Sequence, residues 1–309
     1  MIYTVTSSPA LDYLVWIDHF DPGGLNRTNQ TAFRAGGKGI NVSVVLSRLG
    51  YQSICLGFTA GFVGSELIRL LDNEKIKHNF IHTENGCTRI NVKIKSDTES
   101  EINAYGPQVS EEEIQKLMSQ ISDLQKGDVL IFSGNPPKNL PADIYSRLID
   151  AVPADVHIVV DTSGSHLLSA LAKRPFLIKP NKAELEEIYG NRLDSMEKIA
   201  LAAVELREKG AKNVLVSLGA EGGLLAADDG QVYTCAVPSG KLIDSTGAGD
   251  SMVAGFSAKN LCGAGRAECL RFAVACGCAS TYSYGLLDAK KLEEVYERTP
   301  HPSQRNLFD

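Results

Sequence analysis

The residues best suited to chemistry lie in a glycine-rich turn that an aspartate follows at once. Residues 246–249 read Thr-Gly-Ala-Gly, Asp250 comes next, and the run beyond it is compatible with a helix. Small residues in such a turn let several backbone N–H groups converge on one point, where the dipole of the following helix adds positive charge. The pattern therefore predicts an anion-binding site formed by Gly247, Ala248 and Gly249.

Asp250 adds a second function to this turn. Its carboxylate could accept a proton from a hydroxyl group beside the bound anion, and an anion hole with a neighbouring base is the minimum needed to move a phosphoryl group onto an alcohol. The alternative is structural, because an acidic residue after a tight glycine turn also caps a helix. Since an aspartate ordinarily has a pKa near ~3.9, we expect a weak base whose contribution is mainly positioning.

Two other glycine signatures are excluded by spacing. A dinucleotide-binding fingerprint would need a glycine at position 252, which is Met252. A P-loop would need a hydroxyl residue after Gly-Lys, but Lys38 is followed by Gly39, and Ala32 stands where the first glycine should be. A nucleotide-dependent oxidoreductase is therefore disfavoured.

Residues 35–39 form a second glycine cluster, Ala-Gly-Gly-Lys-Gly, ahead of a predicted helix. Apolar residues at positions 42, 45, 46 and 49, with Gly50 at the end, indicate this helix. A flexible turn is one interpretation of the cluster. We favour a ligand site, because glycines let the backbone approach a ligand closely while Lys38 provides charge and Asn41 lies in the first helical turn.

From about residue 110 the chain alternates between helical and strand patterns. The strand-like runs are 128–133, 157–161, 176–179 and 213–218, and the helical stretches between them are 111–124, 141–151, 182–189 and 195–209. With earlier strands at 2–6 and 53–58, this alternation predicts a mostly parallel sheet with helices on both faces. Ligands of such folds bind at the carboxyl ends of the strands. The motifs expected there are 133–134, Asp161, 179–181, 217–219 and 244–250.

Other segments look like strands outside this core. Residues 13–17 and 27–34 flank a Pro-Gly-Gly turn and suggest an antiparallel ribbon. Residues 88–95 alternate between apolar side chains and polar or cationic ones, including Arg89, and residues 101–105 are expected to return beside them. A strand with one apolar and one cationic face suits a lid over a pocket or a contact with a partner, and a solvated strand face is the alternative.

Asn181 and Glu184 are three residues apart at the start of a predicted helix. Both side chains can face the same side of its first turn, and oxygen ligands of this kind suit Mg²⁺ together with phosphate groups. The same spacing is typical of an N-capping asparagine followed by an acidic residue. Spacing alone slightly favours the cap, so both interpretations stay open.

Composition limits the classes of function. A chain of 309 residues holds one large α/β domain or two small ones. Its net charge of −6 argues against general binding to nucleic acid or to an anionic membrane, and no run of about 18 apolar residues predicts a membrane span. The first six residues read as a strand rather than a signal peptide, and seven scattered cysteines fit a reducing cytoplasm. We expect residues 299–309 to fray.

Taken together, these residues resemble the PfkB (ribokinase-like) family of carbohydrate kinases over essentially the whole chain. The amino-terminal signature is Ala35-Gly-Gly-Lys-Gly-Ile-Asn41-Val42, and the carboxy-terminal one is Asp244-Ser-Thr-Gly-Ala-Gly-Asp250-Ser251. Asn181-x-x-Glu184 lies between them in the order typical of the family. The runs at 4–6, 88–93 and 217–222 are similar to those of bacterial 1-phosphofructokinases.

The resemblance implies a single kinase domain over residues 1–309, with a three-layer α/β core, a mostly parallel sheet and a small β-sheet lid formed by about 11–35 and 87–106. It implies that Asp250 is the base and that residues 247–249 form the anion hole. Lys38 and Arg89 would suit the phosphate that the substrate already carries. The other implied residues are Asp12, Gly37 and Asn41 for the sugar; Lys179, Asn181, Ser217, Leu218, Gly219, Ala220, Glu221, Gly222 and Gly249 for the nucleotide; and Glu184 with Asn181 for Mg²⁺.

The implied activity is ATP-dependent phosphorylation of fructose 1-phosphate on its 6-hydroxyl group, which gives fructose 1,6-bisphosphate. Tagatose 6-phosphate is the alternative substrate, and a catalytically silent sugar-phosphate sensor is the alternative from another class. The expected cofactors are ATP and Mg²⁺, and the expected partner is a small sugar phosphate, with no nucleic acid and no membrane. Lids of this family also mediate dimers, so we expect a homodimer through the lid.

Two positions depart from the family pattern. Ser8 stands where these kinases usually have an asparagine before the proline that follows the first strand, and Asn135 stands where Gly-Ser-x-Pro would have serine. Because the Ser8 side chain is shorter, a contact to a sugar hydroxyl would be lost or bridged by water. Both changes bear on the choice of sugar more than on catalysis.

Overall fold

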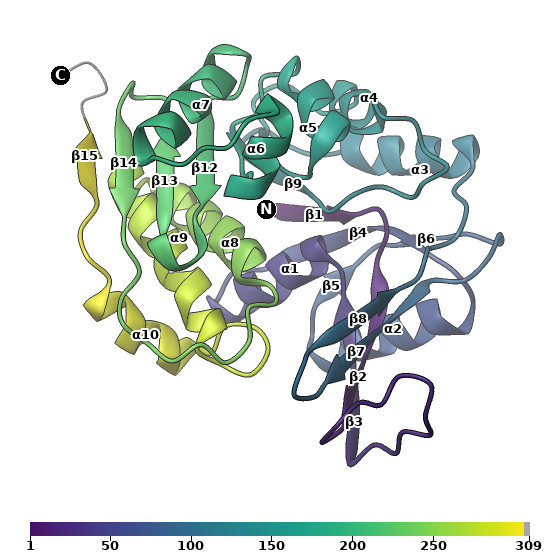
Figure 1. The fold of residues 1–309 in the computed structure, drawn as a ribbon. Helices are drawn as coiled ribbons and strands as arrows, with labels where there is room; N and C mark the ends of the chain where they lie inside the picture. Colours follow the sequence, from purple (N-terminus) through teal and green to yellow (C-terminus); the bar gives the residue numbers. More distant parts are fainter. Residues whose placement is uncertain (306–309) are drawn as a thin grey trace.

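The computed structural model describes residues 1–305, which fold around one large, mostly parallel β-sheet (Figure 1). Its strands are, in spatial order, β15 (Ser303–Arg305), β14 (Val232–Cys235), β13 (Gly223–Ala226), β12 (Asn213–Ser217), β11 (Leu177–Ile178), β10 (His157–Asp161), β9 (Val129–Ser133), β1 (Ile2–Thr6), β4 (Ser53–Thr59) and β5 (Lys77–His78), and β6 (Ile81–His82) also pairs with β4. The strands from β12 to β5 are parallel, whereas β13, β14 and β15 pair antiparallel.

Helices cover both faces of this sheet, so the core has three layers. One face carries α3 (Glu111–Ser122), α4 (Ile144–Asp150), α5 (Gly164–Leu171), α6 (Lys182–Tyr189) and α7 (Met196–Glu208), and the other carries α1 (Lys38–Arg48), α8 (Ala248–Leu261), α9 (Arg266–Thr281) and α10 (Ala289–Arg298). Successive strand residues point to opposite faces. In β9, Leu130 and Phe132 therefore join the first core, and Val129 and Ile131 join the second.

A separate four-stranded sheet stands beside this core. It is formed, in spatial order, by β3 (Gln30–Gly36), β2 (Ala10–Trp16), β7 (Arg89–Lys95) and β8 (Ser100–Asn103). Strands β2 and β3 are antiparallel, β2 and β7 parallel, and β7 and β8 antiparallel. Helix α2 (Gly61–Asn73) lies between this sheet and the core, where Leu67 and Leu71 pack in one cluster with Ile40 of α1.

The structure confirms the predicted fold class and most of the predicted elements. The expected strands at 2–6, 53–58, 128–133, 157–161, 176–179 and 213–218 all belong to the main sheet, and the ribbon at 13–34 and the return strand after 88–95 form the small sheet. Helices α5 and α10 and the strands β5, β6, β14 and β15 were not predicted. Their patterns are short, and each depends on pairing or packing with a segment distant in the chain.

The expectation that the carboxy-terminal tail frays is wrong for residues 303–305. These residues form β15 and pair with β14, and the hydroxyl groups of Ser303 and Thr234 lie 2.8 Å apart. The expectation is also wrong at the start of the tail, because Thr299 is buried and its hydroxyl group donates a hydrogen bond of 2.8 Å to the Val295 carbonyl. Residues 306–309 lie outside the described residues. Within residues 1–305, no helix combines the length and the apolar character needed to cross a bilayer.

Candidate active site

The glycine-rich turn forms the start of helix α8. Gly247 caps the helix with φ of 75°, a left-handed conformation that favours glycine. A Cβ atom at this position would also lie 2.3 Å from Leu286 Cδ2, so a larger residue would have to displace the Leu286 side chain. The first helical turn contains Ala248, Gly249 and Asp250, and the Ala248 amide makes a long hydrogen bond of 3.4 Å to the Ser245 carbonyl. The N–H groups at this end of the helix point out of the helical hydrogen-bond ladder, as the predicted anion site requires.

Asp250 is buried within this first turn, with 5% of its surface exposed. Asn41 Nδ2 of helix α1 donates a hydrogen bond of 2.7 Å to Asp250 Oδ2. Burial raises the pKa of Asp250 to about 6, and the negative charge of Asp161 adds to this rise, whereas the Asn41 hydrogen bond and the nearby lysines oppose it. The expectation of an ordinary pKa near ~3.9 is therefore wrong, because the sequence does not show how deeply the carboxyl group is buried.

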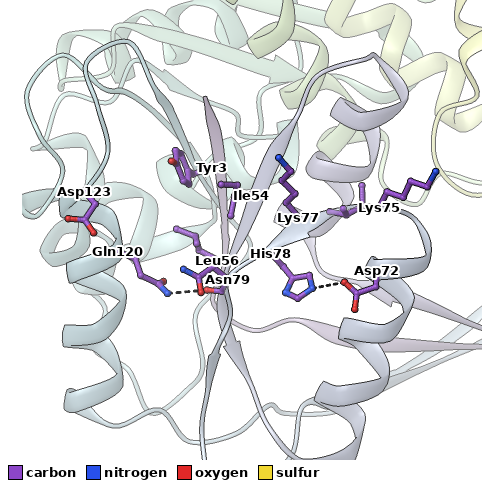
Figure 2. Close-up of a pocket in the computed structure, with 11 residues that line it drawn as sticks. Tyr3, Ile54, Leu56, Asp72, Lys75, Lys77, His78, Asn79, Gln120 and Asp123 are labelled. Atoms are coloured by element: carbon purple, nitrogen blue, oxygen red, sulfur yellow. Dashed lines mark hydrogen bonds and ion pairs between the residues drawn. The ribbon is translucent and has the colours of Figure 1, made fainter.

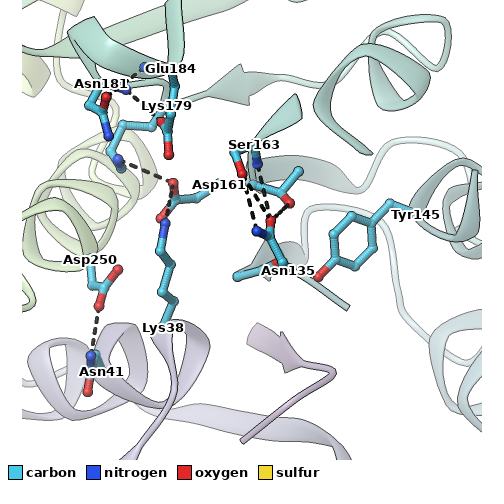
Figure 3. Close-up of polar contacts among 12 residues, drawn as sticks. Lys38, Asn41, Asn135, Tyr145, Asp161, Ser163, Lys179, Asn181, Glu184 and Asp250 are labelled. Carbon is cyan, nitrogen blue, oxygen red and sulfur yellow. Dashed lines mark hydrogen bonds and ion pairs between the residues drawn. The ribbon is translucent and has the colours of Figure 1, made fainter. Parts of the chain in front are cut away.

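Asp161 ends strand β10 and is fully buried between two lysines (Figure 3). Its Oδ1 atom lies 3.2 Å from Lys179 Nζ and 3.6 Å from Lys38 Nζ. The negative charge of Asp161 is the largest effect that raises the pKa of Lys38, so this lysine stays protonated. The sequence pattern predicted that Asp161 lies at a strand end but assigned it no role. Its pairing with both lysines is seen only in the tertiary structure.

Lys179 connects this cluster to the glycine-rich turn. It follows strand β11, only 4% of its surface is exposed, and a Cβ atom at Gly249 would lie 3.1 Å from its Nζ atom. The ammonium group therefore lies against the first turn of α8. A buried cation beside free helix N–H groups strengthens the attraction for an anion.

Asn181 and Glu184 form a capping box at the start of helix α6. Asn181 Oδ1 accepts a hydrogen bond of 2.8 Å from the Glu184 amide, and the Asn181 amide donates one of 2.8 Å to Glu184 Oε2. The structure thus shows the capping interpretation. Within residues 1–305 no group of three or more His, Cys, Asp or Glu side chains is arranged to hold a metal ion. Glu184 Oε1 stays outside the capping bonds, so it fits a cation that takes its other ligands from phosphate or water.

The predicted nucleotide segment lies beside the α6 cap. Asn181 pairs with Ser217 in an isolated parallel bridge, and the Ser217 amide donates to the Pro180 carbonyl. Residues 219–221 then form a single 3₁₀ turn before β13. Gly222 has φ of 97°, and a Cβ atom there would lie 2.0 Å from the Cys235 carbonyl oxygen. The turn is thus held in one shape next to Asn181.

Lys38 and Arg89 line the same cavity, which we call the Arg89 cavity. Its volume is about 1050 Å³, and Thr6, Ser8 and Ser133 are among its other lining residues. Arg89 Nε donates a hydrogen bond of 3.2 Å to the Ser8 carbonyl oxygen. Partial burial lowers the pKa of Arg89, and the charge of Asp12 opposes this shift.

Asp12 and Asn41 line a second cavity, of about 190 Å³. Asp12 lies opposite Asn91 and accepts a hydrogen bond of 2.9 Å from its Nδ2 atom, and burial raises the Asp12 pKa. Gly36 and Gly37 stand between the small sheet and α1, and a Cβ atom at Gly37 would lie 2.6 Å from Thr6 Cγ2. The predicted sugar residues are therefore divided between two cavities.

Asn135, one of the two departures from the family pattern, joins the end of β9 to the end of β10. Its Oδ1 atom accepts hydrogen bonds from the hydroxyl groups of Thr162, at 2.8 Å, and Ser163, at 3.2 Å (Figure 3). The Tyr145 hydroxyl donates a hydrogen bond of 2.6 Å to the Gly134 carbonyl. The asparagine thus has a structural role in this turn, which position alone did not predict.

Another cavity, of about 640 Å³, lies at the β4–β5 edge of the main sheet (Figure 2). Tyr3, Lys77 and Gln120 are among its lining residues, and His78 Nε2 lies 3.0 Å from Asp72 Oδ1. None of the predicted site residues lines it. This cavity is larger than the Asp12 cavity, but it contains none of the predicted site residues, so we do not assign the reaction to it.

Comparisons with known proteins agree with this geometry. A model of the pfkB family carbohydrate kinases matches residues 7–291. The 1-phosphofructokinase of Bacillus subtilis is 41% identical over 284 residues, which cover 92% of this chain and 93% of the relative. The D-tagatose-1-phosphate kinase of Bacillus licheniformis is 37% identical over 297 residues, which cover 96% and 97%.

The crystal structure of phosphofructokinase-2 from Escherichia coli in complex with fructose-6-phosphate has the same fold. It superposes with a TM-score of 0.90 at 30% identity, and the match covers 96% of this chain and 98% of the other. The family match spans both glycine signatures and the buried Asp250. The chain belongs to the pfkB family of carbohydrate kinases.

Proposed function

We propose that this kinase uses ATP to phosphorylate the 6-hydroxyl group of fructose 1-phosphate, giving fructose 1,6-bisphosphate. The observation that carries the proposal is the buried carboxyl group of Asp250, which Asn41 holds at the positive end of helix α8. The same end of the helix suits the transferring phosphoryl group. Fructose 1-phosphate is the proposed substrate because the Bacillus subtilis relative, which is named a 1-phosphofructokinase, matches 92% of this chain.

Asp250 orients the acceptor hydroxyl group and takes its proton. A pKa of about 6 is closer to neutral pH than the ordinary aspartate value, so the carboxylate is a stronger base. Because this pKa is still below neutral pH, most Asp250 side chains remain ionised. The N–H groups of residues 247–249 and the ammonium group of Lys179 hold the negative charge of the transferring group. Positioning and fixed charge therefore provide most of the rate enhancement.

ATP would lie along the segment from Ser217 to Gly222, with its phosphates directed at Lys179 and the α8 turn. Asn181 and Glu184 stand beside that segment, and Glu184 Oε1 would hold Mg²⁺ through phosphate or water ligands. When bound, Mg²⁺ supplies positive charge that neutralises the phosphate oxygens. Asn181 would contribute by fixing the helix start, since its Oδ1 atom already accepts the Glu184 amide.

The small sheet would act as a lid within a single kinase domain of residues 1–309. Residues 11–35 and 87–106 contribute its strands, and both Asp12 and Arg89 belong to it. Closure over the sugar would exclude water that competes for the phosphoryl group. We place the reaction in the cytoplasm, because the seven cysteines lie within the described residues and all of them are free thiols.

A second candidate substrate is D-tagatose 1-phosphate. The Bacillus licheniformis relative that carries this name is similar along 96% of this chain. The two sugar phosphates share the 1-phosphate and the 6-hydroxyl group and differ in configuration at C4. This candidate replaces tagatose 6-phosphate as the main alternative, because it keeps the phosphate at the same end of the sugar.

The experiment that tests the proposal is ADP release with ATP and Mg²⁺ across fructose 1-phosphate, tagatose 1-phosphate, fructose 6-phosphate, tagatose 6-phosphate and fructose. We expect the highest kcat/KM with fructose 1-phosphate. Asp250→Ala should lower kcat by about 10²- to 10⁴-fold while the sugar phosphate still binds. Preference for a 6-phosphate would contradict the proposed substrate, near-normal turnover by Asp250→Ala would contradict the mechanism, and no turnover with any sugar would favour a silent sensor.

A further inference from the structure

The Arg89 cavity carries charge of one sign. Its lining side chains include Lys38, Arg89 and Lys138, and none of its lining residues is acidic. The chain as a whole has a net charge of −6, so this local excess of positive charge runs against the overall balance. A concave site lined by one sign of charge concentrates ligands of the opposite sign.

Two of the three cations already have partners. Lys38 shares Asp161 with Lys179, and its environment includes the charge of Asp250. This places Lys38 toward the end of the site where the phosphoryl group is transferred. Arg89 is tied to the Ser8 carbonyl through Nε, which leaves its terminal N–H groups for a ligand.

Lys138 has a neutral partner and no charged one. Its Nζ atom lies 2.5 Å from the Tyr105 hydroxyl oxygen and 3.9 Å from the centroid of the Tyr105 ring. Within residues 1–305 no carboxylate lies within ion-pair distance of it. A neutral hydroxyl and an aromatic face hold the ammonium group at the cavity without neutralising its charge.

The backbone around Lys138 is also constrained. Pro136 and Pro137 precede it and restrict the loop after β9, and Asn135 anchors the start of this loop to Thr162. Tyr105 follows strand β8 of the small sheet. Lys138 therefore belongs to the core, Arg89 belongs to the small sheet, and both border the same cavity.

We propose that Lys138 is a specificity-determining residue that binds, together with Arg89, the phosphate group that the sugar already carries. The inference rests on the proposed function and makes it more specific. The incoming phosphate dianion takes the place of the Tyr105 hydroxyl as the partner of Lys138 Nζ, and Arg89 approaches the same phosphate from the small sheet. A sugar without this phosphate leaves Lys138 on the neutral Tyr105 hydroxyl and gains neither charge-assisted contact, so it binds less tightly.

The test uses the full chain with three variants. Lys138→Gln removes the charge at similar length, Lys138→Arg keeps the charge, and Lys126→Gln is the matched control, since Lys126 is an exposed lysine paired with Asp155 in the turn before β9. We expect Lys138→Gln to raise KM for fructose 1-phosphate by about 10- to 100-fold, the value for a lost charge-assisted contact. Its kcat and its kcat/KM for unphosphorylated fructose should stay within threefold, Lys138→Arg should recover most of the loss, and Lys126→Gln should match the wild type.

A direct probe is inorganic phosphate as a competitor of the sugar phosphate. We expect its inhibition constant to rise in Lys138→Gln and to stay unchanged in Lys126→Gln. Equal losses with phosphorylated and unphosphorylated sugars, or an unchanged KM, would overturn the inference. If the wild type does not turn over fructose 1-phosphate, the proposed function fails separately, and calorimetric binding of inorganic phosphate to the wild type and to Lys138→Gln still decides the role of Lys138.

Discussion

At the level of single residues, the centre of the site is a group of four charges that share their partners. Asp161 lies between Lys38 and Lys179, and Asp250 lies close enough for its pKa to rise because of Asp161. Two carboxylates and two lysines balance one another in number, so Asp161, Asp250 and Lys179 can be buried beside the half-exposed Lys38 without a net charge. In the proposed reaction, an arriving phosphoryl group would compete with Asp161 for the lysines and so change the charge around Asp250.

The pKa of Asp250 predicts the pH dependence of the reaction. Because the base must be ionised, kcat/KM should fall as pH drops through about 6, with one acidic limb that follows Asp250. In Asp161→Asn the negative charge that raises this pKa is removed, so the limb should move to lower pH. Initial rates between pH 5 and pH 8 measure both profiles, and an unshifted limb in Asp161→Asn would contradict the coupling.

The same burial makes ionised Asp250 costly for folding. Its folded-state pKa lies above the ordinary value, so its contribution to stability is greatest at low pH and is lost as pH rises through about 6. Asp250→Asn cannot ionise and should therefore raise the free energy of unfolding above that pH, by up to about 3 kcal/mol for a shift of about two units. Urea unfolding at pH 5 and pH 8 measures this, and equal stability of the two proteins at pH 8 would refute it.

At the scale of elements, the small sheet touches the turn that precedes α8. Lys95 Nζ of β7 lies 3.7 Å from Asp244 Oδ1, and the same oxygen accepts a hydrogen bond of 3.0 Å from the Thr246 amide. One carboxylate thus joins a strand of the small sheet to the start of the anion-binding turn. Arg34 of β3 lies against Gly285 on the same side, where a Cβ atom would be 2.8 Å from its Nη1 atom.

Loss of the Lys95–Asp244 contact should weaken the coupling between the two substrates. Bound sugar phosphate should increase the affinity for a non-hydrolysable ATP analogue by some factor. We expect Lys95→Ala to reduce this factor by about fivefold, which corresponds to ~1 kcal/mol for a partly buried ion pair. The dissociation constant of the analogue, measured with and without the sugar phosphate, gives this factor. Lys116→Ala removes an ion pair on α3 and is the control; an equal change there would exclude a specific link.

At the scale of the whole molecule, one face of the small sheet carries a row of apolar side chains. Phe33, Tyr13, Val92 and Ile102 are directly paired across its four strands, and the Phe33 and Tyr13 rings stack with centroids 4.7 Å apart. Phe33 is 49% exposed and Ile102 is 62% exposed. An exposed apolar sheet face of this kind suits a protein contact, and we propose that it forms the homodimer interface.

Substitution in this row should therefore change the oligomeric state. We expect the wild type to be a dimer and Phe33→Asp to be mainly monomeric, because a carboxylate would be buried without a partner in the interface. Light scattering after gel filtration measures the mass. Phe62→Asp, at another exposed phenylalanine on α2, is the control and should stay dimeric. A monomeric wild type would rule out the interface.

Features that depend on neighbouring residues could be predicted from the sequence. The α8 turn, the helix after Lys38, the alternation at 88–95 and the repeated helix–strand order follow from backbone preferences and side-chain periodicity, which act over a few residues. The parallel sheet then brought Asp161, Lys179, Ser217 and Asp250 together, so the convergence of these residues was predictable. The signatures in their order also indicated the family.

How these residues share partners follows from the tertiary structure alone. Asn41 and Asp250 are 209 residues apart, and their hydrogen bond, the burial of Asp250 and its raised pKa depend on how α1 packs against α8. The pairing of Asp161 with two lysines, the charge of the cavity beside Lys138 and the capping role of Asn181 have the same origin. Burial and charge balance are properties of surroundings assembled from distant segments, and local patterns carry no information about that assembly.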